Sequence, residues 1–218
     1  MKAAFVIAAL SIAVALSCPA AAAPAFPRRI APVIADIPAG DYRLDPGNSS
    51  ITFRLSHLGF SHYTASFARF DARLHLDPAA PERARIFTTI DPNSLVLTAP
   101  PPGFRAMLLG PQWMNTAKYR AIVFRSTRVV MTGPDTARVE GLFSLHGVTR
   151  PVVLQVTFNG GYRGIEGDPH ARVGFSVGTK FRRSDFGLGF GSHLIAGDEV
   201  DVEIEAEFTG PPPRKPVP

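Results

Sequence analysis

Cysteine is almost missing from this 218-residue sequence, because Cys18 is the only one and it lies close to the N-terminus. A chain cleaved beyond Cys18 has no thiol, which excludes disulfide bonds, thiolate metal sites and cysteine nucleophiles. Metal-binding histidine motifs are missing too, since the six histidines lie on separate segments with no H-E-x-x-H or H-x-x-E-H pattern. We therefore expect neither a metal ion nor any other cofactor.

Catalytic signatures are equally scarce. Ser61 has His57 and His62 as neighbours and Asp71 further on, but the stretch lacks the strand-to-helix turn that exposes a hydrolase nucleophile. A D-F-G triplet at 185–187 stands without the H-R-D and V-A-I-K sequences of a kinase. The sequence favours a protein that is not an enzyme.

Strong charge runs are also absent. The formal net charge is +5, but the arginines are spread along the chain and never form a run of five or six basic residues. Nucleic-acid binding usually needs a basic stripe, so we expect none here. The net positive charge is compatible with a weak contact with an anionic membrane surface.

The N-terminus contains the one long apolar run, Ala3 to Leu16, preceded by Lys2 and followed by small residues. This pattern predicts a signal peptide over 1–25 and export to the periplasm. An alternative is a lipoprotein anchored through Cys18, since "ALSC" weakly resembles a lipidation sequence. Residues 26–40 are predicted to be a proline-rich linker, 41–210 a single domain and 211–218 a flexible proline-rich tail.

Hydrophobic alternation with a period of two dominates the predicted domain. In "EVDVEIEAEF", Val200, Val202 and Ile204 share one face and acidic residues occupy the other. This alternation is typical of strands with one buried and one solvated face. Eight such segments occur, at 50–57, 66–76, 83–91, 121–130, 138–147, 152–158, 172–181 and 199–208.

Two features interrupt this alternation. Phe67 and Phe70 differ in parity, which predicts a bend or bulge between them. The segment from Phe104 to Trp113 has helical spacing, and Pro111 is expected to end or restart the helix. The sequence therefore predicts an all-β domain, a sandwich or a closed antiparallel barrel of about eight strands, with one short helix.

Four stretches, in order, resemble the YceI-like family of bacterial polyisoprenoid-binding proteins. They are "YRLDPGNSSITFRLSHLGFSHYTASFARFDARLHLD", "WMNTAKYRAIVFRSTRV", "GLFSLHGVTRPVVL", and "VGFSVGTKFRRSDFGL" followed by "GDEVDVEIEAEF". The resemblance implies an eight-stranded lipocalin-like barrel, secretion to the periplasm and binding of a long isoprenoid chain of quinone or polyprenyl type. Where the family usually has "HxxRDxHL", this sequence has "PGFRAMLL", which favours a more apolar entrance.

Aromatic residues on the apolar faces are the candidates for ligand contact, joined by the ring-rich corner around His57 and Phe60 and by the helical segment. The full set predicted to bind ligand is Phe53, Leu55, His57, Phe60, Phe67, Phe70, Leu108, Trp113, Phe124, Phe143, Phe158 and Phe175. Large rings and small residues together can either fill a barrel or line a cavity. The predicted function is non-enzymatic binding, sequestration or transport of an isoprenoid lipid. The alternatives are an envelope-stress or structural barrel with a filled core, and an enzyme acting on such lipids.

Overall fold

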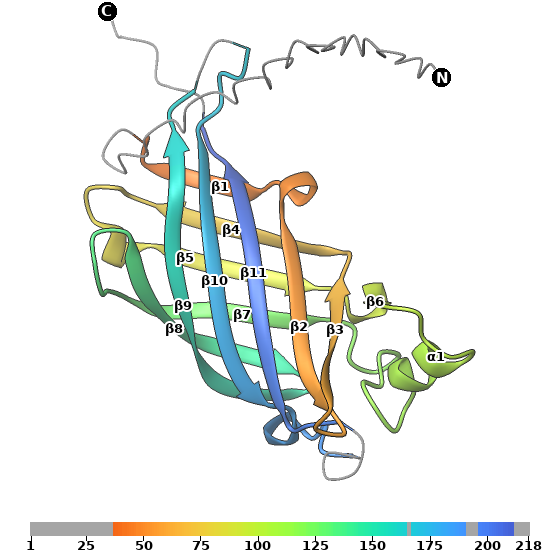
Figure 1. Cartoon of the computed structure of the whole chain (residues 1–218). Coiled ribbons are helices and arrows are strands. Elements are labelled where there is room, and N and C mark those ends of the chain that lie inside the picture. Colours follow the sequence, from red (N-terminus) through yellow and green to blue (C-terminus); the bar gives the residue numbers. More distant parts are fainter. Residues whose placement is uncertain (1–36, 165–166, 191–195, 212–218) are drawn as a thin grey trace, which may run out of the picture.

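The computed structural model describes residues 37–164, 167–190 and 196–211 (Figure 1). The predicted signal peptide, most of the predicted linker and all but the first residue of the predicted tail lie outside these ranges. Residues at the end of that linker belong to the domain, since Ile37 is buried in the core and Tyr42 donates its hydroxyl hydrogen bond to the carbonyl of Pro38. The domain thus begins a few residues before the predicted boundary.

The described residues form eleven strands and one α-helix, with short 3-10 turns between them. The strands are β1 (Gly40–Leu44), β2 (Ser50–His57), β3 (Ser61–Phe67), β4 (Phe70–Leu76), β5 (Arg85–Ile90), β6 (Leu95–Leu97), β7 (Ile122–Met131), β8 (Thr136–Leu145), β9 (Val148–Tyr162), β10 (Arg172–Arg182) and β11 (Glu199–Thr209). The helix is α1 (Phe104–Leu109), and the 3-10 turns include η2 (Pro46–Asn48), η3 (Pro81–Arg83), η4 (Pro92–Ser94) and η5 (Arg183–Phe186).

Eight of the strands close into an antiparallel barrel, as predicted. The ring runs β1-β4-β5-β7-β8-β9-β10-β11, and the pairing of β1 with β11 closes it. The strands β2, β3 and β6 branch off β11, because its first half pairs with β2 while its last residues pair with β1. In Figure 1, β9, β10 and β11 run steeply across the front, and β4, β5 and β7 cross behind them.

The membership of the ring differs from the sequence-based expectation in one respect. The segment 50–57 was expected to be a barrel strand, yet β2 lies on the branch, and the short β1 takes the closing position. The cause is the bend predicted between Phe67 and Phe70. There the chain turns from β3 to β4 at Ala68 and Arg69, whose backbone N–H groups donate to the carbonyl and hydroxyl of Ser94. Because β3 pairs with β2 and β4 pairs with β1, the bend separates the two hairpins.

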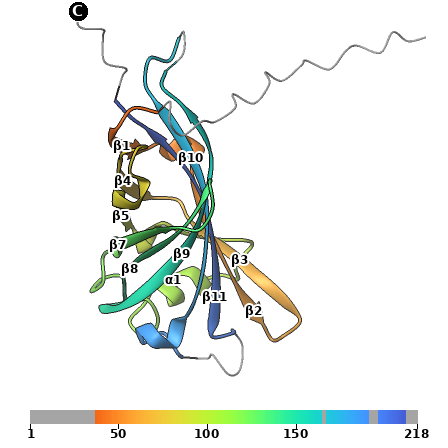
Figure 2. The same ribbon diagram turned by 90° about the vertical axis from the view of Figure 1, so that its left-hand side faces the viewer.

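The interior contains two hydrophobic clusters at different levels. The first joins β1, β4 and the ends of β9 to β11 around Tyr42, Leu74 and Val173. The second joins β2, β3, β6, η5 and α1 around Ile51, Leu95 and Phe186. Figure 2 shows β2 and β3 leaving the barrel wall at this second end. The helix is short, as predicted, since it ends at Gly110 just before Pro111.

Candidate functional site

A cavity of about 150 Å³ lies inside the barrel against the first cluster. Of its 25 lining residues, 22 are apolar, and the other three are Thr88, Asp135 and Thr136. Most of the apolar residues come from the eight strands of the closed ring and from β2, because each strand points alternate side chains inward. The chamber is therefore suited to a hydrocarbon and offers few polar partners.

The strand β9 shows that this part of the barrel is hollow. Its inward residues Leu154, Val156 and Phe158 are only half-buried, and the residues between them are exposed. By contrast, the inward residues of β4, such as Leu74 and Leu76, are fully buried. A completely filled barrel would bury both sets. The free space therefore lies along β9, β10 and β11.

The cavity reaches the surface between η3 and the turn that joins β7 to β8. Its rim includes Pro81, Met131, Pro134 and Asp135, of which the last three are exposed. The backbone carbonyl of Asp135 accepts a hydrogen bond of 2.7 Å from the N–H of Phe158, which fixes this turn against β9. An apolar chain that enters here meets proline and methionine before it meets the strand interior.

Three of the predicted ligand-binding residues, Phe70, Phe158 and Phe175, line the cavity. Phe158 and Phe175 contact each other with ring centroids 5.5 Å apart. Phe124 is buried close to the cavity, with its ring against Gly141, and its strand neighbour Thr88 lines the cavity.

Four others belong to the second cluster and do not line the cavity. Phe53 and Phe67 stack at 5.4 Å, and Phe143 lies 5.3 Å from the rings of both Phe181 and Phe186. Leu108 packs against the same cluster from α1. Aromatic rings fill this end of the interior, whereas the other end contains the cavity. The sequence left open whether the barrel is filled or hollow, and the structure shows both in one barrel.

The predicted corner at the end of β2 does not form a ring-lined clamp. His57 and Phe60 are exposed at the tip of the β2–β3 hairpin, and Leu55 is half-buried in β2 without belonging to either cluster. Trp113 lies in the turn after α1, where its ring meets that of Phe190 at 5.3 Å. The structure therefore does not bring these four residues to the cavity.

Several cavity residues were not among the predicted site residues. They are mostly aliphatic, and include Val129, Met131, Val139, Leu154, Val156, Val177, Ile204 and Ala206. The alternation of their strands could have identified these residues, since each of them shares a face with other apolar residues. Restricting the candidates largely to aromatic rings missed them.

A hydrolase-like pattern, G-x-S-x-G, occurs at 174–178 but lies within β10 rather than at a strand-to-helix turn. The Ser176 hydroxyl donates to Glu205 at 2.8 Å and accepts from Asn159 at 2.8 Å. Since neither partner is a general base of the histidine type, this serine is an outward-facing strand residue with surface hydrogen bonds.

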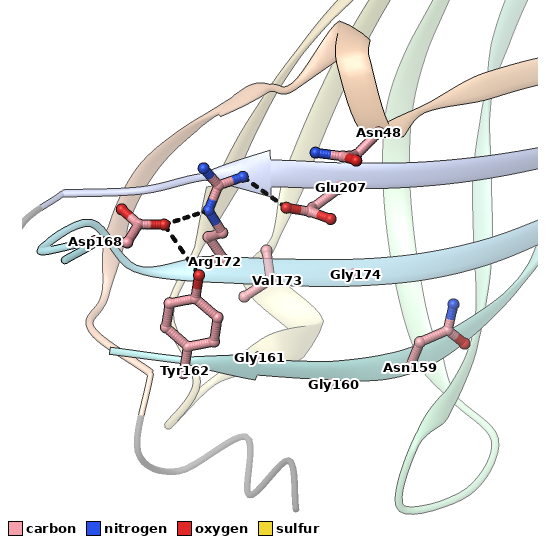
Figure 3. Close-up of a pocket in the computed structure, with 10 residues that line it drawn as sticks. All are labelled: Asn48, Asn159, Gly160, Gly161, Tyr162, Asp168, Arg172, Val173, Gly174 and Glu207. Atoms are coloured by element: carbon pink, nitrogen blue, oxygen red, sulfur yellow. Dashed lines mark hydrogen bonds and ion pairs between the residues drawn. The ribbon is translucent and has the colours of Figure 1, made fainter. Parts of the chain in front are cut away.

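A second hollow of about 590 Å³ lies on the outer surface at the level of the first cluster, where Val173 belongs to both (Figure 3). Arg172 forms ion pairs there with Asp45 at 2.8 Å, Asp168 at 2.6 Å and Glu207 at 2.6 Å. The hydrogen bond from Arg172 is the main cause that lowers the pKa of both Asp45 and Asp168. These ion pairs connect Asp45, which follows β1, to β10 and β11. They therefore stabilise the place where β1 and β11 close the ring.

The described residues contain no group of three or more His, Cys, Asp or Glu side chains placed to hold a metal ion. Within the same ranges, no helix is long and apolar enough to cross a membrane.

The comparisons with known proteins agree with this architecture. Among curated relatives, a UPF0312 protein of Azotobacter vinelandii is 34% identical over 176 residues, covering 78% of this chain and 86% of that protein. A UPF0312 protein of Vibrio cholerae is 30% identical over 173 residues, covering 78% and 87%.

Among solved structures, Burkholderia cenocepacia BcnA superposes with a TM-score of 0.67 at 21% identity, covering 75% of this chain and 98% of that chain. A polyisoprenoid-binding domain from Saccharophagus degradans superposes with a TM-score of 0.60 at 16% identity, covering 80% and 100%. These two likenesses support the fold. The model of the YceI-like domain matches residues 42–208, nearly the whole barrel, and the chain therefore belongs to the YceI-like family.

Proposed function

We propose that this protein binds an isoprenoid lipid inside the barrel and keeps its chain away from water. The observation that carries the proposal is the cavity, whose lining is apolar except for Thr88, Asp135 and Thr136. Such a chamber gains affinity from apolar burial and has little to offer a polar ligand. The Saccharophagus degradans neighbour is a polyisoprenoid-binding domain, which supports this choice among apolar ligands.

The size of the cavity limits how a long chain can be held. A volume of about 150 Å³ holds a molecule the size of benzene, or roughly one isoprene unit. Burial of the roughly five carbons of one unit contributes about 4 kcal/mol at ~0.8 kcal/mol per methylene. Association costs ~4–15 kcal/mol, so one unit alone binds weakly. A longer chain must therefore widen the space, and the half-buried Phe158 and Phe175 are the side chains best placed to move.

The ligand is proposed to be of quinone or polyprenyl type, and the protein to act as a carrier rather than as an enzyme. The described cavity lining supplies one carboxylate and two hydroxyls, with no histidine, lysine or serine beside them to form a catalytic pair. Asp135 lies at the rim, where it can meet only the part of a ligand that remains near the surface.

The protein is further proposed to act in the periplasm after removal of residues 1–25. The apolar run from Ala3 to Leu16 supports this location. Intact mass of the exported protein is the test. A mass that starts near residue 24 or 26 supports cleavage, whereas a mass that includes a lipidated Cys18 contradicts it and makes the following segment a tether.

Blocking the cavity tests the proposed binding. Ala206 lines the cavity beside Phe175, its partner in strand register, so Ala206→Leu fills part of the free volume. The matched control is Ala68→Leu at an exposed position between β3 and β4. We expect delipidated wild type and the control to take up a short-chain isoprenoid quinone, and Ala206→Leu to take up far less while remaining folded. Equal uptake by all three proteins would place the binding elsewhere.

A further inference from the structure

We propose that the barrel end formed by the β2–β3 hairpin, α1 and residues 187–190 after η5 docks on the surface of an anionic lipid bilayer. This end carries the two most exposed aromatic residues among the described ones, Phe60 at 87% and Phe190 at 63% exposure. Leu58 and Met107 add two further exposed apolar side chains. Single exposed apolar residues are common, but four from three separate segments at one end of a domain indicate an interaction site.

The tip of the β2–β3 hairpin holds an exposed leucine in a backbone conformation that is uncommon for this residue. Leu58 has φ of 53° and Gly59 has φ of 74°, and the N–H of Phe60 donates to the carbonyl of His57. Turns with two positive φ angles favour Asn-Gly, and a leucine there adopts an uncommon backbone conformation. Leu58 and Phe60 are not buried in return, so packing within the domain does not explain them.

The segments that carry these residues are fixed to one another. The buried guanidinium of Arg183 donates to the carbonyls of Leu188, Phe190 and Ala196. Ala196 in turn forms a β-bridge with His57 at the base of the hairpin tip. The same end is visible at the bottom of Figure 1, where the β2–β3 hairpin lies beside the turn η5 that follows β10. These contacts link Phe190 to the base of the hairpin that carries Phe60.

Trp113 supports the exposed ring of Phe190 from behind. The two rings meet edge to face at 5.3 Å, and Trp113 is the only tryptophan of the chain. Tryptophan and phenylalanine on protruding loops are the side chains that enter the boundary between lipid head groups and acyl chains most readily.

The charge around this end suits an anionic surface. The stretch from 92 to 121, which contains α1 and Trp113 and ends just before β7, has no aspartate or glutamate, and its basic residues are Arg105, Lys118 and Arg120. The segment from 46 to 70, which contains the hairpin, has no acidic residue either. Of the acidic residues near this end, Asp198 accepts hydrogen bonds from the backbone N–H and hydroxyl of Ser184, and Glu199 pairs with Lys180 at 3.5 Å, whereas Asp185 in η5 is exposed.

The contacts of Tyr119 place its sequence neighbours Lys118 and Arg120 beside this end. Tyr119 packs on His146 with centroids 4.5 Å apart, and the Nδ1 of His146 lies 3.2 Å from the carbonyl oxygen of Phe186 in η5. Lysine and arginine next to an apolar tip add attraction to anionic head groups. A protein partner needs a continuous complementary surface of roughly 1,000 Å² or more, whereas separate protruding side chains can each enter a bilayer.

The fluorescence of Trp113 tests the proposal, using vesicles without isoprenoid so that the result does not depend on the cavity. The vesicles are made of phosphatidylcholine alone or mixed with phosphatidylglycerol, with brominated acyl chains as quenchers. We expect quenching of Trp113 by the anionic vesicles, weaker quenching by the neutral ones and a further loss at high salt. Absence of quenching in wild type would overturn the proposal.

The variant Phe60→Ser/Phe190→Ser should weaken vesicle binding by at least about tenfold, because one well-buried ring supplies more than that factor. The matched control is Leu142→Ser on the outer barrel wall, where Leu142 is 45% exposed, and it should bind as wild type does. All variants share one N-terminus, so any contribution of residues 1–36 is common to them. Unchanged binding by the double variant, or equal loss in the control, contradicts the proposal.

Self-association is the rival explanation of the exposed rings. A dimer in sedimentation velocity that Phe60→Ser/Phe190→Ser dissociates, without vesicle binding by wild type, would overturn the choice of a bilayer. The failure of lipid uptake in the cavity would instead leave vesicle docking intact, so the two proposals fail separately.

Discussion

A methyl group at Gly141 should destabilise the barrel, because the space beside this residue is already occupied. A Cβ built there would lie 2.3 Å from the Cζ of Phe124 and 2.6 Å from the backbone carbonyl oxygen of Arg125. Phe124 is buried in β7, so its ring cannot rotate into solvent. Both Phe124 and the strand backbone would have to shift to accept Gly141→Ala.

The magnitude follows from two opposing effects. Overpacking of a core costs about 1–3 kcal/mol. Replacement of a glycine by alanine returns ~0.4–1 kcal/mol by restricting the unfolded chain. The net loss should be roughly 1–2 kcal/mol, or a fall in Tm of about 2–8 °C for a domain of this size. Thermal unfolding followed by circular dichroism measures it.

The control is Gly178→Ala in β10. Nothing lies within 4 Å of a Cβ built at Gly178, and neither glycine has a positive φ angle. Gly178→Ala should therefore leave Tm unchanged or raise it slightly. Equal Tm values for Gly141→Ala and Gly178→Ala would show that Phe124 is not packed against Gly141 as described, and would refute the reasoning.

Two other perturbations test the ion pairs of Arg172 and the filled second cluster. Arg172→Met removes the hydrogen bonds that lower the pKa values of Asp45 and Asp168, whose ordinary value is 3.8. A lowered carboxyl pKa stabilises the fold above the unfolded pKa and loses this effect as pH falls through the folded pKa. Wild type should therefore be more stable than Arg172→Met at neutral pH, and their Tm values should converge below about pH 4. Parallel melting curves across that range would contradict the role of Arg172. Phe143→Glu should unfold the domain, since it places a charge against Phe186, which is 1% exposed. A folded variant with unchanged Tm would contradict the filled second cluster.

The sequence predicted the fold class because strand alternation is a local property. Within β11, the inward residues Val200, Val202 and Ile204 follow directly from that period. The strands that it missed include β1 and β6, which are only five and three residues long, too short for alternation to be distinctive. It also missed most of β3, of which the predicted segment 66–76 covers only Ser66 and Phe67. Ring closure also depended on pairing between β1 and β11, which are far apart in the chain.

The site was predicted less well than the fold, because burial on one face does not say whether neighbouring side chains leave space. Phe143 and Phe158 have similar strand patterns, yet the first packs into a ring cluster and the second lines a cavity. That difference arises from the branching of β2 and β3 and from η5, which bring Phe53, Phe67 and Phe186 to one end only. The exposed position of Phe60 depends likewise on the hairpin turn at Leu58 and Gly59.

The most direct test of the central claim is organic extraction of freshly purified protein followed by mass spectrometry. The claim is that the apolar chamber beside Phe158 and Phe175 holds an isoprenoid chain. A near-stoichiometric isoprenoid lipid in the extract is the predicted result. An extract free of lipid, or one containing only the phospholipids of the host membrane, would contradict the account.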